Sequence, residues 1–342
     1  MPGEPGAPGA VAPDSRFTIR AYEPGDESAI LELFARAFGV SRTVAHWRWE
    51  FEQNPLGARR ISLAFDSDGR LVGQYAGYPV SFRDGDAGFM AHQIGDTMTD
   101  VSVRHVGRGP TSIFGQIAGH FYRTYCDGQV AFNYGFNVSN VQKFSMRFLR
   151  SDRVEPVPYR VRDLRADPIA RIPRAARWLR GFQLELVTDP GEEWDRFFEQ
   201  VAPAYRFLTR RDAQYIRWRY LEHPGRTCFI VAIRKWRRLA GWSVFRVREH
   251  RLIWGDALFD PRHPEAVEVL LRHIVPGYPV DALEAWFPKR PEWFDAILAN
   301  LRLEVRTEPQ DLALMCVPFA IPDATARMRE RLYYTMGDSD LF

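Results

Sequence analysis

A short glycine-rich turn carries the clearest chemical signature in the sequence. Arg104, Gly107 and Gly109 lie within six positions, after a run rich in Thr and Val and directly before Pro110. Glycine permits positive φ angles, so backbone N–H groups can converge in such a turn, and proline suits the first turn of a helix. The N-terminus of a helix offers unpaired N–H donors and the positive end of its dipole to an anion. The spacing therefore favours a phosphate site.

A strand before this turn and a helix after it must position the site. Thr and β-branched residues predict the strand, and apolar residues at near 3.6-residue spacing predict the helix. The expected elements are a strand at 17–22, helices at 27–38 and 44–52, three strand-like runs, of which the last is at 94–103, a helix at 111–123, a strand at 130–138 and a helix at 139–149.

The spacing Arg104-x-x-Gly107-x-Gly109 resembles the pyrophosphate loop of the GNAT superfamily, the acyl-CoA-dependent N-acyltransferases. The expected order of elements on both sides of the loop agrees with this resemblance. The turn is not like a P-loop, because no Gly-Lys-Ser/Thr follows it. The resemblance implies an acyl-CoA site formed by Thr97, Thr99, Arg104, Val106, Gly107, Arg108, Gly109, Thr111, Asn137 and Asn140.

Two residues are candidates for proton transfer. Asp96 lies on the strand that leads to the loop, where GNAT proteins often carry a base. Many GNAT proteins also have a Tyr on the fourth helix that protonates the departing thiolate. The expected helix at 139–149 offers only phenylalanines, so Tyr134 on the preceding strand is the substitute that we consider. A structural role for Asp96 and a core position for Tyr134 remain open.

The second half of the chain repeats the first. The phrase RWEFEQNP at 48–55 recurs as RWRYLEHP at 217–224, and Gly95-Asp96 recurs as Gly255-Asp256. We interpret this as a tandem duplication, each copy running helix, helix, strands, helix, strand, helix. The second copy has FDPRHPE at 259–265 in place of the glycine-rich turn and is expected to hold no nucleotide phosphate. The shared tryptophans are expected to pack in the two cores.

The sequence thus predicts an α/β (α+β) protein with two tandem GNAT-like domains, each a mixed, mostly antiparallel central sheet flanked by helices. The expected parts are a disordered N-terminal lead at 1–15, a GNAT-like domain with the acyl-CoA site at 16–160, a basic amphipathic linker at 161–182, a degenerate GNAT-like domain at 183–320, and a C-terminal helix with an acidic, late-packing or frayed tail at 321–342.

Composition narrows the class of protein further. The chain has 342 residues, of which 46% are apolar, enough for two hydrophobic cores. A net charge of +3 does not favour a nucleic-acid partner by itself. Three widely spaced cysteines fit a reducing compartment, and neither a transmembrane run nor a cluster of metal ligands is evident. We expect a cytoplasmic protein without a bound metal and leave the oligomeric state open.

The resemblance implies transfer of an acyl group, acetyl by default, from acyl-CoA to the amine of a small molecule or amino sugar. Two alternatives remain open. One is an aminoacyl-transferring enzyme of the cell-wall type with tandem GNAT-like domains, which the arginine-rich linker would suit. The other is a non-catalytic module that binds CoA or another ligand, which the missing helix Tyr would suit.

Overall fold

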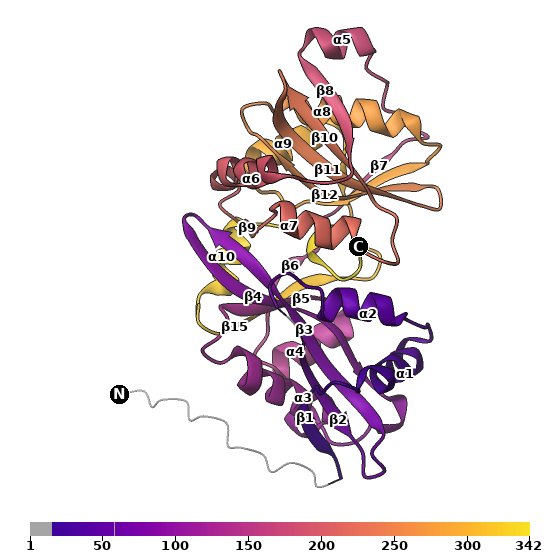
Figure 1. The fold of residues 1–342 in the computed structure, drawn as a ribbon, viewed down its shortest axis with the longest axis vertical. Coiled ribbons are helices and arrows are strands. Elements are labelled where there is room, and N and C mark those ends of the chain that lie inside the picture. Colours follow the sequence, from indigo (N-terminus) through magenta and orange to yellow (C-terminus); the bar gives the residue numbers. More distant parts are fainter. Residues whose placement is uncertain (1–15, 58) are drawn as a thin grey trace.

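The chain folds into two sheets with their helices, stacked along the long axis of an elongated molecule (Figure 1). The computed structural model describes residues 16–57 and 59–342. The expected N-terminal lead at 1–15 lies outside the described residues.

The first half confirms the expected order of elements. It contains β1 (Thr18–Ala21), α1 (Glu27–Phe38), α2 (Val44–Phe51), β2 (Arg60–Phe65), β3 (Leu71–Asp84), β4 (Ala87–Thr99), the 3₁₀ turns η1 (Val101–Val103) and η2 (Gly109–Thr111), α3 (Ile113–Phe121), the π-helical turn η3 (Tyr122–Cys126), β5 (Phe132–Asn137), α4 (Ser139–Phe148), β6 (Asp152–Pro156) and β7 (Tyr159–Asp163).

Two boundaries beside the glycine-rich turn differ from the expectation, each because a side chain caps the backbone. The strand expected to reach 103 ends at Thr99, because Asp100 accepts hydrogen bonds from the amide and the hydroxyl of Ser102 and turns the chain. The helix expected from 111 begins at Ile113, because the Ser112 hydroxyl accepts from the Gly115 amide at 3.1 Å as an N-cap.

The second half repeats the same order, which confirms the tandem arrangement. It contains α5 (Arg174–Leu179), β8 (Phe182–Val187), α6 (Glu192–Tyr205), β9 (Phe207–Thr209), α7 (Ala213–Ile216), the π-helical turn η4 (Arg217–Leu221), β10 (Phe229–Lys235), β11 (Arg238–Arg248), β12 (Arg251–Phe259), α8 (Glu265–Ile274), η5 (Val275–Gly277), β13 (Ala282–Trp286), α9 (Glu292–Asn300), β14 (Glu304–Val305), β15 (Ala313–Pro318), α10 (Ala324–Arg331), β16 (Leu332–Tyr333) and η6 (Met336–Asp338).

The two halves exchange a strand. Among the described residues the main path of the first sheet runs β1-β2-β3-β4-β5-β15-β6, and the second sheet runs β8-β10-β11-β12-β13-β7-β14. In the first sheet β9 also pairs with the end of β3, and β16 pairs with β9. The order is the same in both, but β15 comes from the second half of the chain and β7 from the first. The sequence ranges 16–160 and 183–320 therefore do not each contain a complete sheet.

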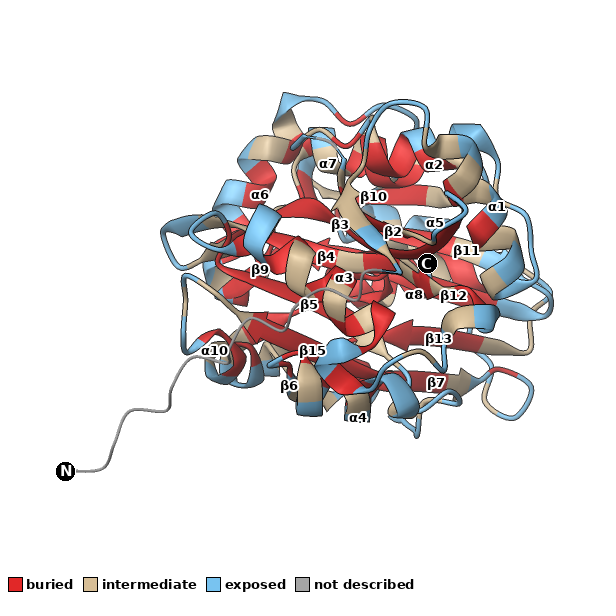
Figure 2. Ribbon diagram, turned by 90° about the horizontal axis from the view of Figure 1, so that it is seen from below, coloured by how far each residue is buried: buried red, intermediate tan, exposed pale blue. Residues whose placement is uncertain are grey.

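A pair of tryptophans joins the two halves at equivalent positions of the repeat. The Trp49 indole N–H donates to the Trp218 carbonyl at 2.7 Å, and the Trp218 indole N–H donates to the Trp49 carbonyl at 2.9 Å. Their rings stack at 5.2 Å. Both are buried, as expected for core tryptophans, and the strands around them are buried while exposed residues gather on helices and loops (Figure 2).

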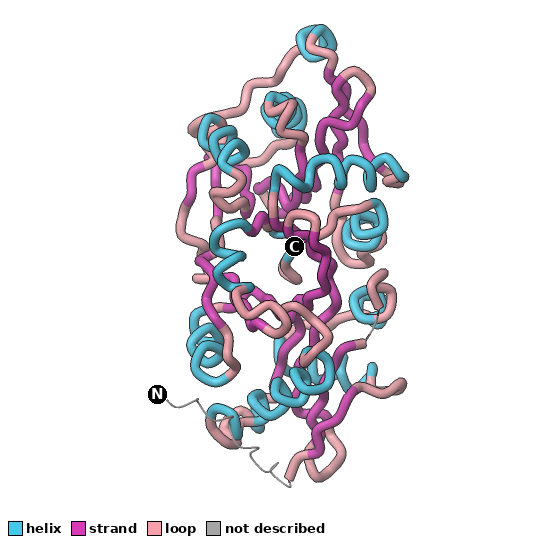
Figure 3. Tube along the Cα trace, turned by 90° about the vertical axis from the view of Figure 1, so that its left-hand side faces the viewer, coloured by secondary structure: helices cyan, strands magenta, loops and turns pink. Residues whose placement is uncertain are grey.

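The end of the chain lies between the halves rather than fraying as an acidic tail (Figure 3). Residues 335–342 are mostly buried. The guanidinium of Arg219 donates to the carbonyls of Gly337 at 3.0 Å and Phe342 at 3.1 Å, and Arg226 donates to the carbonyl of Asp340 at 2.8 Å. These bonds tie the end of the chain to the second half by satisfying its backbone carbonyls.

Candidate active site

The glycine-rich turn has the backbone geometry that its sequence predicted. Gly107 and Gly109 adopt φ angles of +70° and +55°. A Cβ atom on Gly107 would collide with the carbonyl oxygen of Thr111, and one on Gly109 would lie 2.6 Å from the Phe148 ring. The turn therefore has room for backbone alone at both positions, as a loop that wraps a phosphate requires.

The amides of this turn divide into two groups. The Val106 amide donates to the Val103 carbonyl at 3.0 Å, and the Arg108 amide donates to the Thr111 hydroxyl at 3.0 Å. Within the described chain, the amides of Gly107 and Gly109 have no acceptor and can serve a ligand. Of the predicted loop residues, two thus offer free amides while the others hold the turn in shape.

A cavity of about 300 Å³ lies beside this turn, between the end of β4 and the helices α3 and α4. Four of the predicted acyl-CoA residues line it, namely Thr97, Thr99, Arg104 and Asn140. Apolar side chains from the two helices complete the wall, including Ile113, Phe114, Val141 and Phe144. A polar end beside the turn and an apolar wall suit a phosphate carrier with a long, less polar arm.

The cavity exists because two parallel strands separate. The pairing of β4 with β5 covers His92 with Asn133 and Gln93 with Tyr134, whereas β4 continues to Thr99 and β5 continues to Asn137. In the described sheet, Thr97 and Thr99 thus have no partner on their β5 side. The Thr99 carbonyl accepts from the Arg104 side chain at 3.0 Å, and no partner on the β5 side competes with a ligand for the remaining backbone groups.

Asp96 lies at the bend of β4, but its carboxylate is held by a cation. The pairing of β3 with β4 shifts register between Gln74 and Ala76, opposite Asp96, whose φ angle is +50°. The Arg42 guanidinium forms ion pairs with Asp96 and with Glu50. Burial raises the pKa values of both carboxyl groups above their usual range, and Arg42 opposes that shift.

The second half contains the same ion pair. Arg211 donates to Asp256 at 3.0 Å, and Arg42 precedes Arg211 by the same 169 residues that separate Trp49 from Trp218. Arg211 and Asp256 are fully buried. Because the pair recurs in the copy without the glycine-rich turn, the geometry favours a structural role for Asp96.

Tyr134 lies in the core of the first sheet. Its ring packs edge to face on Phe82 at 5.4 Å, and burial raises its pKa well above the usual range. It is absent from the linings of the cavity beside the turn and of the larger cavity described next. Asn137 lines that larger cavity, and its side chain donates to the Ser145 hydroxyl at 3.4 Å.

A second cavity of about 540 Å³ adjoins the first, and both are lined by Thr97 and Val141. Its walls come from the first half, from the segment before β15 and from the end of the chain, which contributes Asp340. When the Gln93 side-chain amide is oriented so that its oxygen and its nitrogen both have hydrogen-bond partners, the oxygen accepts from the Asp340 backbone amide at 2.7 Å. Sequence reasoning missed Asp340, because nothing in the pattern of an acidic tail places it against β4.

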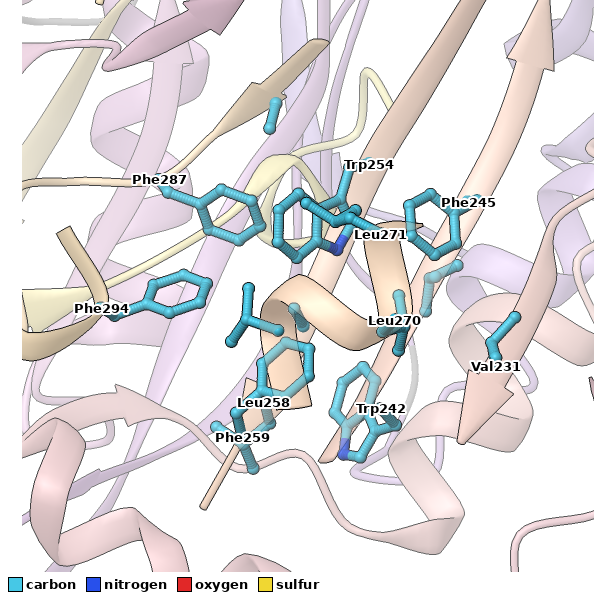
Figure 4. Close-up of a cluster of buried hydrophobic side chains, with 14 of the residues drawn as sticks. Val231, Trp242, Phe245, Trp254, Leu258, Phe259, Leu270, Leu271, Phe287 and Phe294 are labelled. Atoms are coloured by element: carbon cyan, nitrogen blue, oxygen red, sulfur yellow. The ribbon is translucent and has the colours of Figure 1, made fainter. Parts of the chain in front are cut away.

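The corresponding opening in the second half is filled with side chains (Figure 4). Trp254 of β12 and Phe287 beyond β13 have ring centres 4.7 Å apart, and Phe287 packs on Phe294 of α9 at 5.2 Å. Leu270 and Leu271 of α8 are fully buried in the same cluster. This aromatic packing fills the space between β12, β13 and the helices α8 and α9.

Other kinds of site are not evident in the part of the chain that the structure describes. No group of three or more His, Cys, Asp or Glu side chains is arranged to hold a metal ion. No described helix combines the length and the apolar character needed to cross a membrane. Cys126, Cys228 and Cys316 are free thiols.

The comparisons with known proteins agree with this geometry. Residues 18–148 match the model of the Acetyltransferase (GNAT) domain family. No curated protein matches the sequence.

Solved structures match over most of the chain. One is a conserved protein of unknown function from Enterococcus faecalis V583, described as a probable N-acyltransferase, with a TM-score of 0.68 and 12% identity over 89% of this chain and 73% of that chain. Another is a GCN5-related N-acetyltransferase from Kribbella flavida, with a TM-score of 0.64 and 15% identity over 90% and 72%. A third is the Saccharomyces cerevisiae N-myristoyltransferase with bound myristoyl-CoA, with a TM-score of 0.56 and 10% identity over 90% and 84%.

At these identities the structural likeness concerns the fold, while the family model covers the half that carries the glycine-rich turn. Residues 18–148 thus form a domain of the GNAT acetyltransferase family, and the chain as a whole shares the two-sheet fold of solved proteins described as N-acetyltransferases or N-acyltransferases.

Proposed function

We propose that this acyltransferase moves an acyl group, acetyl by default, from acyl-CoA to the amine of a small molecule or amino sugar. The observation that carries the proposal is the junction of two cavities at Thr97 and Val141, one beside the glycine-rich turn and one that faces the end of the chain. A donor and an acceptor can meet at such a junction, which is the arrangement that transfer between two substrates needs.

The residues that would hold acyl-CoA line the first cavity or belong to the adjacent glycine-rich turn, whose glycines do not themselves line the cavity. The amides of Gly107 and Gly109 and the first turn of α3 would receive the phosphates, with the Arg104 side chain nearby. Thr97 and Thr99 would offer backbone groups to the pantetheine arm, and Asn140 lies on the opposite wall. Bound acyl-CoA supplies the activated acyl group, and the protein orients it.

The rival functions have less support from the described residues. The arginine-rich linker is the feature that would suit an aminoacyl-transferring enzyme and its RNA partner. It contains α5, which lies at the end of the molecule away from the first half (Figure 1). The absence of a Tyr on α4 remains the sole argument for a non-catalytic module.

Two measurements test the proposal. Calorimetry should show binding of acetyl-CoA to the purified full chain. Release of free thiol from acetyl-CoA should then rise when phenethylamine, octylamine, ethanolamine, spermidine or glucosamine is added. Binding without turnover by any of these amines would favour the non-catalytic module, and no binding would reject the acyl-CoA site itself.

A further inference from the structure

The larger cavity combines charged side chains, among them Arg42, Asp96 and Arg226, with a group of exposed apolar ones. Five large hydrophobic side chains that are between 37% and 59% exposed line this one cavity. They are Phe38, Val40, Val138, Val141 and Leu341. Scattered single exposed apolar residues need no explanation, but several around one hollow mark a binding surface.

One carboxylate at this cavity, that of Asp340, forms no ion pair with a described Lys, Arg or His side chain. The buried acids nearby differ, because Arg42 pairs with Asp96 and Arg211 pairs with both Asp256 and Asp338. Asp340 is half-buried, and a carboxylate that has lost part of its hydration is stabilised by a bound cation.

Asp340 is also close to the junction with the acyl-CoA cavity. A Cβ atom built on Gly95 would lie 3.2 Å from the Asp340 carboxylate, so this carboxylate is directly against the backbone of β4. Thr97, two residues further along β4, lines both cavities. A group bound to Asp340 is thus held beside the place where the acyl group would arrive.

We propose that the acceptor is an amphiphilic amine, a cationic amino group on an apolar body, and that Asp340 receives its ammonium group while the apolar residues hold its body. This inference rests on the proposed acyl transfer to amines and narrows its acceptor. The apolar lining disfavours amino sugars, whose hydroxyl groups would lose hydrogen bonds with water there.

Acyl transfer to the ammonium group requires that the nitrogen lose two protons. Asp340 accepts one proton from the ammonium group, and the freed nitrogen lone pair forms the bond to the acyl carbon. The carbon–sulfur bond breaks, the thiolate takes the second proton from the nitrogen, and Asp340 returns its proton to water. The products are an amide, free CoA and one proton.

The charge around Asp340 sets the pH at which it acts. Burial and the neighbouring Asp96 raise the pKa of Asp340 to about 6, while Arg219 and Arg226 oppose that shift. Glu50 and Arg42 also act on it electrostatically. Since the carboxylate form exists above this pKa, transfer to a protonated amine should decline as the pH falls through about 6.

The first test concerns the apolar body. Octylamine and phenethylamine should exceed glucosamine in kcat/KM by about a hundredfold in the thiol-release assay. Phe38→Ser should raise the KM for octylamine by about tenfold. Trp178→Ser, which changes a more exposed aromatic on α5, should leave the KM unchanged. The inference would be overturned if glucosamine were the preferred acceptor. It would also be overturned if the enzyme preferred long acyl chains in the donor but did not distinguish among the amines.

The second test concerns Asp340. Asp340→Asn should lower kcat/KM for octylamine by about a hundredfold or more and abolish the limb near pH 6, while acetyl-CoA affinity and thermal unfolding stay at wild-type values. Asp340→Glu should recover part of the rate and the limb. An unchanged rate and limb in Asp340→Asn, or loss of the limb in Glu50→Gln instead, would overturn the role of Asp340 and leave the proposed transfer intact.

A lack of turnover with all amines would overturn the proposed function and this inference together. Normal turnover with an unaffected Asp340→Asn variant would overturn the inference alone, so the two failures are distinguishable.

Discussion

Gly107 is the residue at which backbone geometry and ligand binding depend most directly on each other. Gly107→Ala should weaken acetyl-CoA binding by about tenfold or more, because its Cβ meets the Thr111 carbonyl and must displace the turn. Gly69→Ala is the matched control, since Gly69 has a similar φ of +77° and open space around it. Calorimetry on both variants checks this, and equal affinities would show that the turn does not hold the phosphates.

The sequence predicted some of the individual residues of the candidate site. Thr97, Thr99, Arg104 and Asn140 line the cavity because a strand, a turn and a helix in fixed order bring them together. Asp340 was not predictable, because contacts between the two halves set the path of residues 335–342. Arg42 could have been found, since the repeat offset pairs it with Arg211.

At the scale of elements, the exchanged strands tie the halves into one folding unit. A fragment of residues 1–182 lacks β15, which pairs with β5 on one side and with β6 on the other. Its sheet would have unpaired edges in the middle, so we expect an aggregating fragment without cooperative unfolding.

Co-expression with residues 183–342 supplies every strand and should give a soluble complex that binds acetyl-CoA. Denaturant unfolding and gel filtration check both outcomes, and a cooperative, monomeric 1–182 fragment would contradict them.

The elements themselves were largely predictable, whereas their exchange was not. Helix and strand periodicities report which face of an element is buried, and β7 and β15 are both mostly buried in the sheets where they lie. The spacing of residues therefore predicted the order of elements in each copy but carried no information about which copy receives the last strand.

For the whole molecule, duplication produced two equivalent openings with different contents. The first lies beside the glycine-rich turn and stays hollow, and the second is filled by Trp254, Phe287 and Phe294. The second half nevertheless contributes to the larger cavity through Arg226, Asp340 and Leu341. We therefore expect that its role is to position the end of the chain.

Arg211 tests that idea, because it connects β12 to the end of the chain through Asp256 and Asp338. All three side chains are buried, so Arg211→Met leaves two carboxylates without their cation and should lower the free energy of unfolding by about 3–5 kcal/mol. Arg217→Met removes a largely exposed ion pair with Asp189 and should cost about 0–1 kcal/mol. Urea unfolding measures both values, and similar small losses would show that the buried cluster does not hold the halves together.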